Sequence, residues 1–154
     1  MASKVSSARI VTRTGVPAVV APGREHDVLV RVLAGADVGT LFVPGAEVLS
    51  ARKHWIAYGA KPVGRIVIDD GAARALRDHG KSLLPAGVVA VEGEFDLGDN
   101  VSIVAAGVEL ARGLAAYPAA DLRKISGLQS GAIEARLGYK SIDEAIHRDD
   151  LVIL

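Results

Sequence analysis

Helix and strand signals alternate twice within the first 44 residues of this chain. Residues 3–14 place apolar side chains on one side of a predicted helix. The continuous apolar run VPAVVA at 16–21 predicts a strand buried on both faces. A second helix at 27–35 and a second strand at 38–44 follow. This alternation predicts a parallel or mixed sheet with covering helices, an α/β architecture.

Two strands are too few to form a stable open sheet with both faces covered. We therefore interpret residues 1–44 as a remnant of a larger α/β domain. Its further strands are expected outside this sequence.

Residues 45–63 differ from the segments on either side and are interpreted as a connector. They contain the single Trp of the chain, Trp55, next to the basic triplet at 52–54. Ser50 is expected to cap a short helix that runs to Tyr58. Trp55 is expected to dock on one of the flanking domains.

From Gly64 onward the strands become short and closely spaced. Asp- and Gly-bearing turns join several of them, as hairpins require. Asp70 is expected to cap the first helix of this region. The predicted strands are 64–70, 88–95, 98–105, 109–117 and the closing DDLVIL at 149–154, and the predicted helices are 71–80 and 118–127. Residues 64–154 are therefore predicted to form a mainly β, partly closed barrel with short helices.

Composition excludes several classes of protein. Half of the residues are apolar and 23% are charged, which is typical of a globular protein and excludes a disordered one. With no Cys, disulfides, thiolate nucleophiles and Cys-based zinc sites are unavailable. No apolar run is long enough to span a membrane, and the first residues do not resemble a secretory signal. Cytoplasmic localisation is the default expectation.

The charge of the chain is balanced overall but unevenly distributed. Residues 1–63 carry eight Lys and Arg against four Asp and Glu, a net charge of +4. Residues 64–154 carry ten against fourteen, a net charge of −4. An acidic C-terminal region is a poor electrostatic match for nucleic acid.

Two stretches resemble the glutamate 5-kinase family. MASK, with the helix VSSARIVTRTGV and then VVAPGRE, is similar to the end of that family's amino acid kinase domain. The run from GTLFVP through SLLPAGVVAVEGEF to HRDDLVIL resembles the family's linker and its C-terminal PUA domain. The resemblance implies an amino acid kinase-like α/β remnant at 1–44, a connector at 45–63 and a PUA pseudo-barrel at 64–154.

The resemblance also implies a function. Glutamate 5-kinases transfer the γ-phosphoryl group of ATP, with Mg²⁺, to the side-chain carboxylate of L-glutamate in the first step of proline biosynthesis. The positions that match the family's ATP-phosphate segment are Met1, Ala2, Ser3 and Lys4. A helix N-terminus with a Lys in its first turn is suited to phosphate.

Met1 resembles an internal Met of that motif, so the rest of the kinase domain is expected upstream. The family's N-terminal phosphate loop and glutamate-binding residues have no counterpart here. We therefore expect no catalytic residue in this chain and no activity or cofactor binding from it alone. The PUA domain is expected to be regulatory or structural. The resemblance further implies a homo-oligomer and feedback inhibition by proline.

A non-enzymatic RNA-binding PUA module is the alternative. Arg65, Arg74, Arg77 and Lys81 lie on the first strand and helix, where RNA-binding PUA domains place part of their RNA surface. The acidic net charge and the few aromatic residues of 64–154 argue against this alternative.

No other motif points to chemistry. The four His residues are scattered, which predicts no metal site. The triplet His147-Arg148-Asp149 imitates a protein-kinase motif but lacks its partners, and we interpret it as a coincidence.

Overall fold

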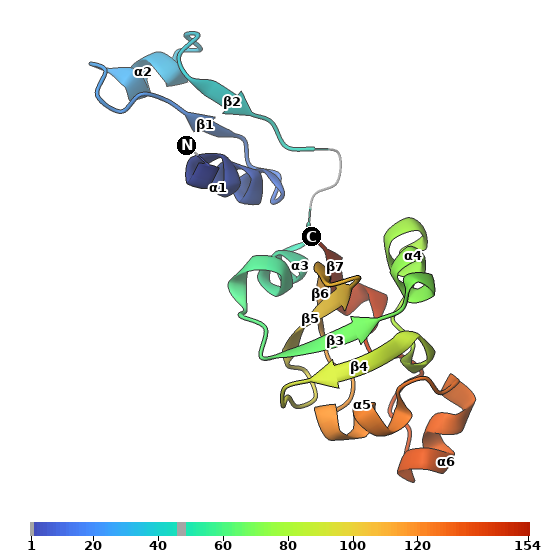
Figure 1. The fold of residues 1–154 in the computed structure, drawn as a ribbon. Coiled ribbons are helices and arrows are strands. Elements are labelled where there is room, and N and C mark those ends of the chain that lie inside the picture. The colour runs from blue at the N-terminus through green and yellow to red at the C-terminus, as the bar shows by residue number, and fades with distance from the viewer. Residues whose placement is uncertain (1, 46–48) are drawn as a thin grey trace. The chain divides into compact units, whose positions relative to one another are not determined.

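The computed structural model describes residues 2–45 and 49–154, and these divide into two compact units. The first unit comprises Met1–His54 and the second Trp55–Leu154 (Figure 1). The division falls inside the predicted connector. Residues 46–48 of that connector lie outside the described residues. No helix in the described part of the chain has the length and apolar character that crossing a lipid bilayer requires.

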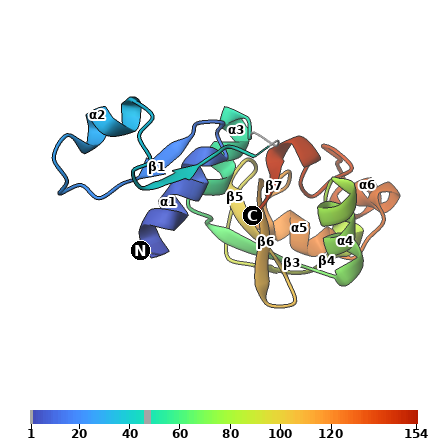
Figure 2. The ribbon, with the colours of Figure 1, turned by 90° about the horizontal axis from the view of Figure 1, so that it is seen from above.

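In the first unit, one helix lies across a pair of short strands (Figures 1 and 2). The strands are antiparallel, and Val19 lies opposite Leu41. The elements of this unit are α1 (Ala2–Thr12), β1 (Ala18–Val20), α2 (Val28–Leu33), β2 (Thr40–Phe42) and α3 (Ala51–His54).

The described part of this unit thus contains one antiparallel pair, whereas the alternation predicts a larger parallel or mixed sheet with covering helices. A parallel pair needs a crossover helix that packs on the sheet. The helix between these strands, α2, has no buried residue and so does not cover them. The strand at 16–21 is also not buried on both faces, since Val19 is 41% exposed.

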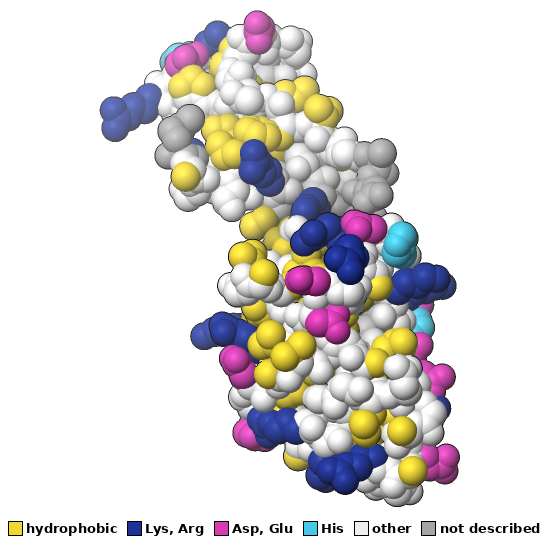
Figure 3. All heavy atoms as spheres, turned by 45° about the vertical axis from the view of Figure 1, so that its right-hand side comes forward, with side chains coloured by type: hydrophobic (Ala, Val, Ile, Leu, Met, Phe, Trp, Pro, Cys, Tyr) yellow, Lys and Arg dark blue, Asp and Glu magenta, His cyan; other side chains and the backbone are white. Residues whose placement is uncertain are grey.

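The first unit leaves many apolar side chains exposed. Within its described part, only Ala8 and Thr12 of α1 are buried. Hydrophobic side chains are visible over this unit in the upper part of Figure 3. The exposed large ones are Val11, Val16, Val19, Leu29, Val30, Leu33, Leu41 and Val43. The unit thus has very little core of its own.

The second unit is built on a five-stranded mixed sheet with the order β4-β3-β5-β6-β7. Strand β3 runs antiparallel to β4 and parallel to the central strand β5, and the other pairs are antiparallel. The strands are β3 (Gly64–Ile68), β4 (Val88–Glu92), β5 (Asn100–Ala105), β6 (Val108–Leu114) and β7 (Leu151–Ile153). The helices are α4 (Asp70–His79), α5 (Ala119–Ile125) and α6 (Ile133–Leu137).

One hydrophobic core joins the sheet to these helices. Ile66 of β3 and Ile103 of β5 are fully buried, as are Leu122 of α5 and Ile133 of α6. Apolar side chains that alternate along the strands supply one face of this core. The mixed sheet, the short helices and the closing strand at the end of the chain agree with the predicted fold.

Helix α4 begins one residue earlier than expected, and its cap differs. Asp69, not Asp70, is the N-cap, since its carboxylate accepts the N–H of Ala72 at 2.7 Å. The helix ends at Gly80, whose positive φ of 56° suits glycine. Asp70 lies in the first turn, where an acidic side chain favours the helix dipole.

The second half of the connector belongs to the second unit. Trp55–Gly59 form a π-helical turn directly after α3, whose cap Ser50 accepts the N–H of Lys53 at 3.3 Å, as expected. Ile56 and Ala57 are buried, whereas Trp55 is half exposed. The connector therefore docks through its small and branched apolar residues rather than through Trp55.

Two side chains of the sheet hold this connector turn, defined here as residues 55–60. Asn100 of β5 donates from Nδ2 to the carbonyl oxygens of Ile56 at 2.8 Å and Ala60 at 3.1 Å. Arg112 of β6 donates from Nη1 to the carbonyl oxygen of Ala57 at 2.7 Å. A π turn leaves carbonyl groups without ordinary helical partners, and these donors satisfy three of them.

A carboxylate orients Arg112 for this contact. Glu109 accepts from Nε of Arg112 at 2.9 Å and from the hydroxyl of Ser102 at 2.9 Å. The hydrogen bond from Arg112 is the main reason why the pKa of Glu109 lies below its ordinary value. The chain Ser102, Glu109, Arg112 thus connects the sheet to the connector turn.

Replacing Asn100 by Ala is expected to lower the free energy of unfolding of the second unit by about 1–3 kcal/mol, because two buried carbonyl groups lose their donor. Urea denaturation measures this change. Hydrogen exchange at the Ala60 amide, which donates to Trp55, is expected to accelerate. The exposed Gln129→Ala is the control. Equal stability of the two variants would show that Asn100 does not hold the connector turn.

Replacing Arg112 by Gln is expected to raise the pKa of Glu109 toward 4.5, its ordinary value. Because folding lowers this pKa, the stabilisation by the carboxylate is present above pH 4.5 and is lost as the pH falls through the folded-state value. Titration of the Glu109 side-chain carbon by NMR measures the shift. Arg123→Gln, on α5, is the control and should leave the Glu109 pKa unchanged.

Candidate functional site

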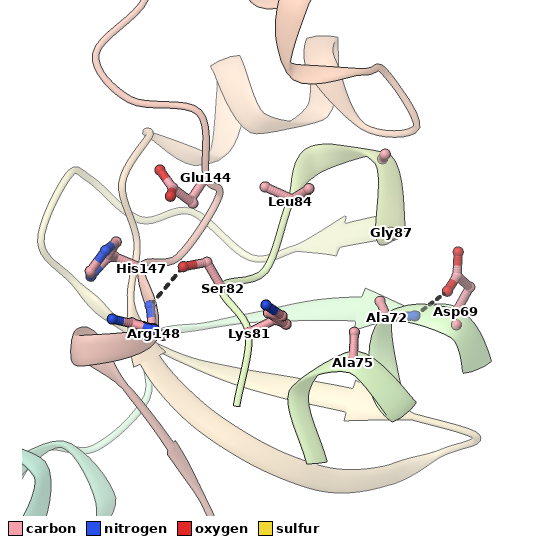
Figure 4. A pocket seen from close by; sticks show the side chains of 12 residues that line it. Asp69, Ala72, Ala75, Lys81, Ser82, Leu84, Gly87, Glu144, His147 and Arg148 are labelled. Carbon is pink, nitrogen blue, oxygen red and sulfur yellow. Dashed lines mark hydrogen bonds between the residues drawn. The ribbon is translucent and has the colours of Figure 1, made fainter. Parts of the chain in front are cut away.

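A groove of about 700 Å³ opens on the surface of the second unit. Helix α4 forms one side, and the segments 81–87 and 144–148 form the rest (Figure 4). We call it the α4 groove. Ala72, Ala75 and Leu84 give it apolar walls, and charged side chains gather at one end.

Backbone pairing holds the two irregular segments together. Leu83 donates its N–H to the carbonyl oxygen of Ile146 at 2.9 Å, and Ala145 donates to the carbonyl oxygen of Leu83 at 2.7 Å. Leu83 and Ile146 are buried. Because side chains alternate along extended segments, Leu84 and His147 are directed to the groove.

Tyr117 fixes the segment that leads into the groove. Its ring is fully buried. Its hydroxyl donates to the carbonyl oxygen of Ile142 and accepts the N–H groups of Ser141 and Ile142, both at 3.2 Å. The chain is thus anchored just before Glu144, where the groove wall begins.

A second tyrosine ties the same segment to α5. Tyr139 donates its hydroxyl to Asp121 of α5 at 2.6 Å. Lys124 also donates to Asp121, at 2.7 Å, and it is the first cause of that carboxyl group's lowered pKa. The hydrogen bond to Asp121 is the main reason why the pKa of Tyr139 is raised to about 12. The phenol therefore remains a donor at neutral pH.

The turn at Pro85–Gly87 packs directly against α4. Gly87 accepts the N–H of Asp69 through its carbonyl oxygen at 3.1 Å. A Cβ at Gly87 would lie 2.5 Å from the Cβ of Ala72. This position therefore requires glycine for close approach, and the groove keeps its shape because the turn can lie so near the helix.

The basic end of the groove, defined as Lys81, His147 and Arg148, surrounds the hydroxyl of Ser82 (Figure 4). Ser82 accepts the N–H of Arg148 at 3.0 Å. The Nδ1 of His147 accepts the N–H of Asp149 at 3.3 Å and also lies 3.5 Å from the Asp149 carboxylate. This end can therefore present several hydrogen-bond donors to one ligand group.

The candidate RNA-facing residues are only partly brought together. Lys81 lines the groove, whereas Arg74 and Arg77 of α4 do not. Arg65 lies on β3 and pairs with Glu92 of β4 at 3.4 Å. Helical rotation explains the difference, since groove positions 72 and 75 lie on a different face from 74 and 77. His147 and Arg148, set aside as a coincidence in the sequence, line the groove instead.

The candidate ATP-phosphate residues lie in the first unit. Ser3 and Lys4 of α1 line a hollow of about 480 Å³ together with Val19 of β1. The first turn of α1 contains no acidic residue, so its N–H groups and Lys4 suit phosphate. Ala2 is the first residue of α1, and Met1 lies outside the described residues.

No metal-binding group is found in residues 2–45 and 49–154, where no three His, Asp or Glu side chains come together.

Comparison with known proteins gives one family match. Residues 64–137 match the family model described as PUA domain. A solved structure with 27% identity, a PUA domain from Aeropyrum pernix K1 in a tartrate complex, covers 56% of this chain and 41% of its own, with a TM-score of 0.41.

The whole chain is similar to curated glutamate 5-kinases. It is 50% identical over 155 aligned residues to the glutamate 5-kinase of Syntrophus aciditrophicus, covering all of this chain and 40% of that protein. The glutamate 5-kinase of Geobacter sulfurreducens is also 50% identical, with 42% of its length covered. The chain therefore spans about two fifths of the length of these relatives.

Gly87→Ala is expected to lower the free energy of unfolding by about 1–3 kcal/mol, because the added methyl group overlaps Ala72 and displaces the turn from α4. The urea midpoint measures this loss. Gly131→Ala is the matched control, since a Cβ there meets no atom within 4 Å. A Gly87→Ala protein as stable as the control would show that the close approach to α4 is dispensable.

Proposed function

Because residues 64–137 are a PUA domain and the whole chain matches the C-terminal part of glutamate 5-kinases, we propose that it serves as that part of such an enzyme. The proposed reaction is transfer of the γ-phosphoryl group of ATP to the side-chain carboxylate of L-glutamate. The identity of 50% along the entire chain is the observation that carries the proposal. The proposed setting is the cytoplasm.

The surface of the first unit supports this assignment. Leu41 and Val43, at and after β2, are 60% and 71% exposed, and α2 exposes Leu33 at 88%. Large apolar side chains exposed to this degree are typical of a surface that another part of a protein covers. We propose that the remaining strands and helices of an amino acid kinase domain provide this cover, and that the complete enzyme is a homo-oligomer.

Lys4 and Ser3 are proposed to contact the phosphates of ATP. A Lys ammonium group and free helix N–H groups stabilise charge on a transferring phosphoryl group. Lys4 has no ion pair within the described residues, so its charge is available. Bound ATP with Mg²⁺ would supply the phosphoryl group, and this end of α1 would orient it.

The second unit is proposed to be regulatory or structural, and the chain alone is proposed to be inactive. The α4 groove and the core of this unit need nothing from the first unit, since all their described residues lie in 55–154. A self-contained domain of this kind can modulate a kinase without contributing catalytic groups.

A chimera tests the proposal directly. The 155 aligned C-terminal residues of the Syntrophus aciditrophicus enzyme are replaced by this chain, and glutamate-dependent acyl phosphate is trapped as the hydroxamate. The chimera is expected to be active and this chain alone inactive. An inactive but folded chimera would contradict the kinase role. A version ending at His54 tests what the second unit adds.

Within the chimera, Lys4→Ala is expected to lower kcat about 10²-fold or more, as for the loss of one preorganised charge at a reacting phosphoryl group. Arg9→Ala, in the last turn of the same helix, is the control. Similar kcat values for the two variants would remove Lys4 from the proposed ATP site while leaving the family assignment in place.

A further inference from the structure

We propose that the basic end of the α4 groove binds a small anionic molecule through a carboxylate or phosphate group. This site shares no residue with the proposed ATP site, because its residues all belong to the second unit and α1 belongs to the first. The ligand is proposed to carry its oxyanion against Lys81, His147 and Arg148 and a short aliphatic body along the groove.

The donors at this end come from two segments of the chain that line the same groove. Lys81 follows α4, whereas His147 and Arg148 precede β7, and the pairing of Leu83 with Ile146 brings the two segments together (Figure 4). The hydroxyl proton of Ser82 has no acceptor among the described residues, since its oxygen only accepts from Arg148. Hydrogen bonds from the charged Lys81 and Arg148 side chains to an oxyanion are stronger than hydrogen bonds between neutral groups.

Asp149 is the acidic partner of two of the three basic groups, at 3.5 Å from Nδ1 of His147 and 3.9 Å from Nε of Arg148. Lys81 has no ion pair in residues 2–45 and 49–154. The Arg148 side chain is 65% exposed and that of His147 is 40% exposed. The nearby N-terminus of α4 is not part of the site, because Asp69 already caps it.

The walls of the groove are apolar, so the part of the ligand beyond its oxyanion group is expected to be apolar too. Ala72, Ala75, Leu84 and Ala86 present apolar surface, and Leu84 is 43% exposed although it is a large hydrophobic residue. A pocket of about 700 Å³ with apolar walls and a few polar groups at one end suits a small molecule.

Three observations favour a small anion over RNA. Residues 55–154 carry eleven Lys and Arg against fourteen Asp and Glu, a net charge of −3. On the face seen in Figure 3, acidic and basic side chains are interspersed over this unit. Glu144 lies in the groove wall, and no Phe, Tyr or Trp side chain is among the described residues that line it. Polyanion binding requires a continuous positive field, and base recognition relies on stacking.

The test is an NMR titration of the ¹⁵N-labelled full chain with succinate and, separately, inorganic phosphate. Amide shifts are expected to change at residues 81–87 and 144–148. Shifts with succinate alone would identify the ligand group as a carboxylate. Shifts with phosphate alone would identify it as a phosphoryl group, and shifts with both would identify a site for oxyanions in general. The double variant Lys81→Gln/Arg148→Gln is expected to weaken binding about tenfold or more.

Arg74→Gln/Arg77→Gln is the matched control, because it removes the same charge from α4 outside the groove lining. Should the first double variant not fold, the single Lys81→Gln, at an exposed side chain, replaces it. Absence of shifts, or equal weakening by both double variants, would overturn the proposal. Tight, salt-sensitive binding of a 20-nucleotide RNA at these amides without any response to the small anions would also overturn it.

Discussion

The pairing of Leu83 with Ile146 is the contact on which the second unit depends. It joins the segment after α4 to the segment before β7, and both side chains are completely buried or nearly so. From this pairing the chain continues into β7, which pairs with β6 through Arg112 and Val152. The pairing of Leu83 with Ile146 thus leads the chain into the last strand of the sheet, and it also forms part of the groove wall.

The connector turn belongs to the second unit because of its hydrogen bonds and its buried side chains. Its π-helical carbonyls need donors from outside the turn, and Asn100 and Arg112 supply them from neighbouring strands. Ile56 adds apolar burial that an isolated linker would lack. A connector is usually expected to be independent of both domains, but here three carbonyl groups of its last residues accept hydrogen bonds from the sheet.

Local features of the fold could be predicted from the sequence, and non-local ones could not. Alternating apolar residues and Gly- or Asp-bearing turns place the strands of the second unit within a few residues. The antiparallel pairing of β1 with β2 was missed, because it depends on α2 not packing on the strands. The place of His147 and Arg148 in the groove was missed, because Lys81 is distant from them in sequence and the pairing of Leu83 with Ile146 brings the segments together.

The two units differ in what their own residues can stabilise. The second buries side chains from every strand and helix in one core, whereas in the described part of the first only Ala8 and Thr12 are buried. Since hydrophobic burial is the main favourable term in folding, the first unit gains little from its own contacts. We therefore interpret its exposed apolar residues as one side of an interface rather than as a surface that faces solvent. The second unit, with Tyr117 and Leu83 fixing its loops, has a groove that exists without any partner.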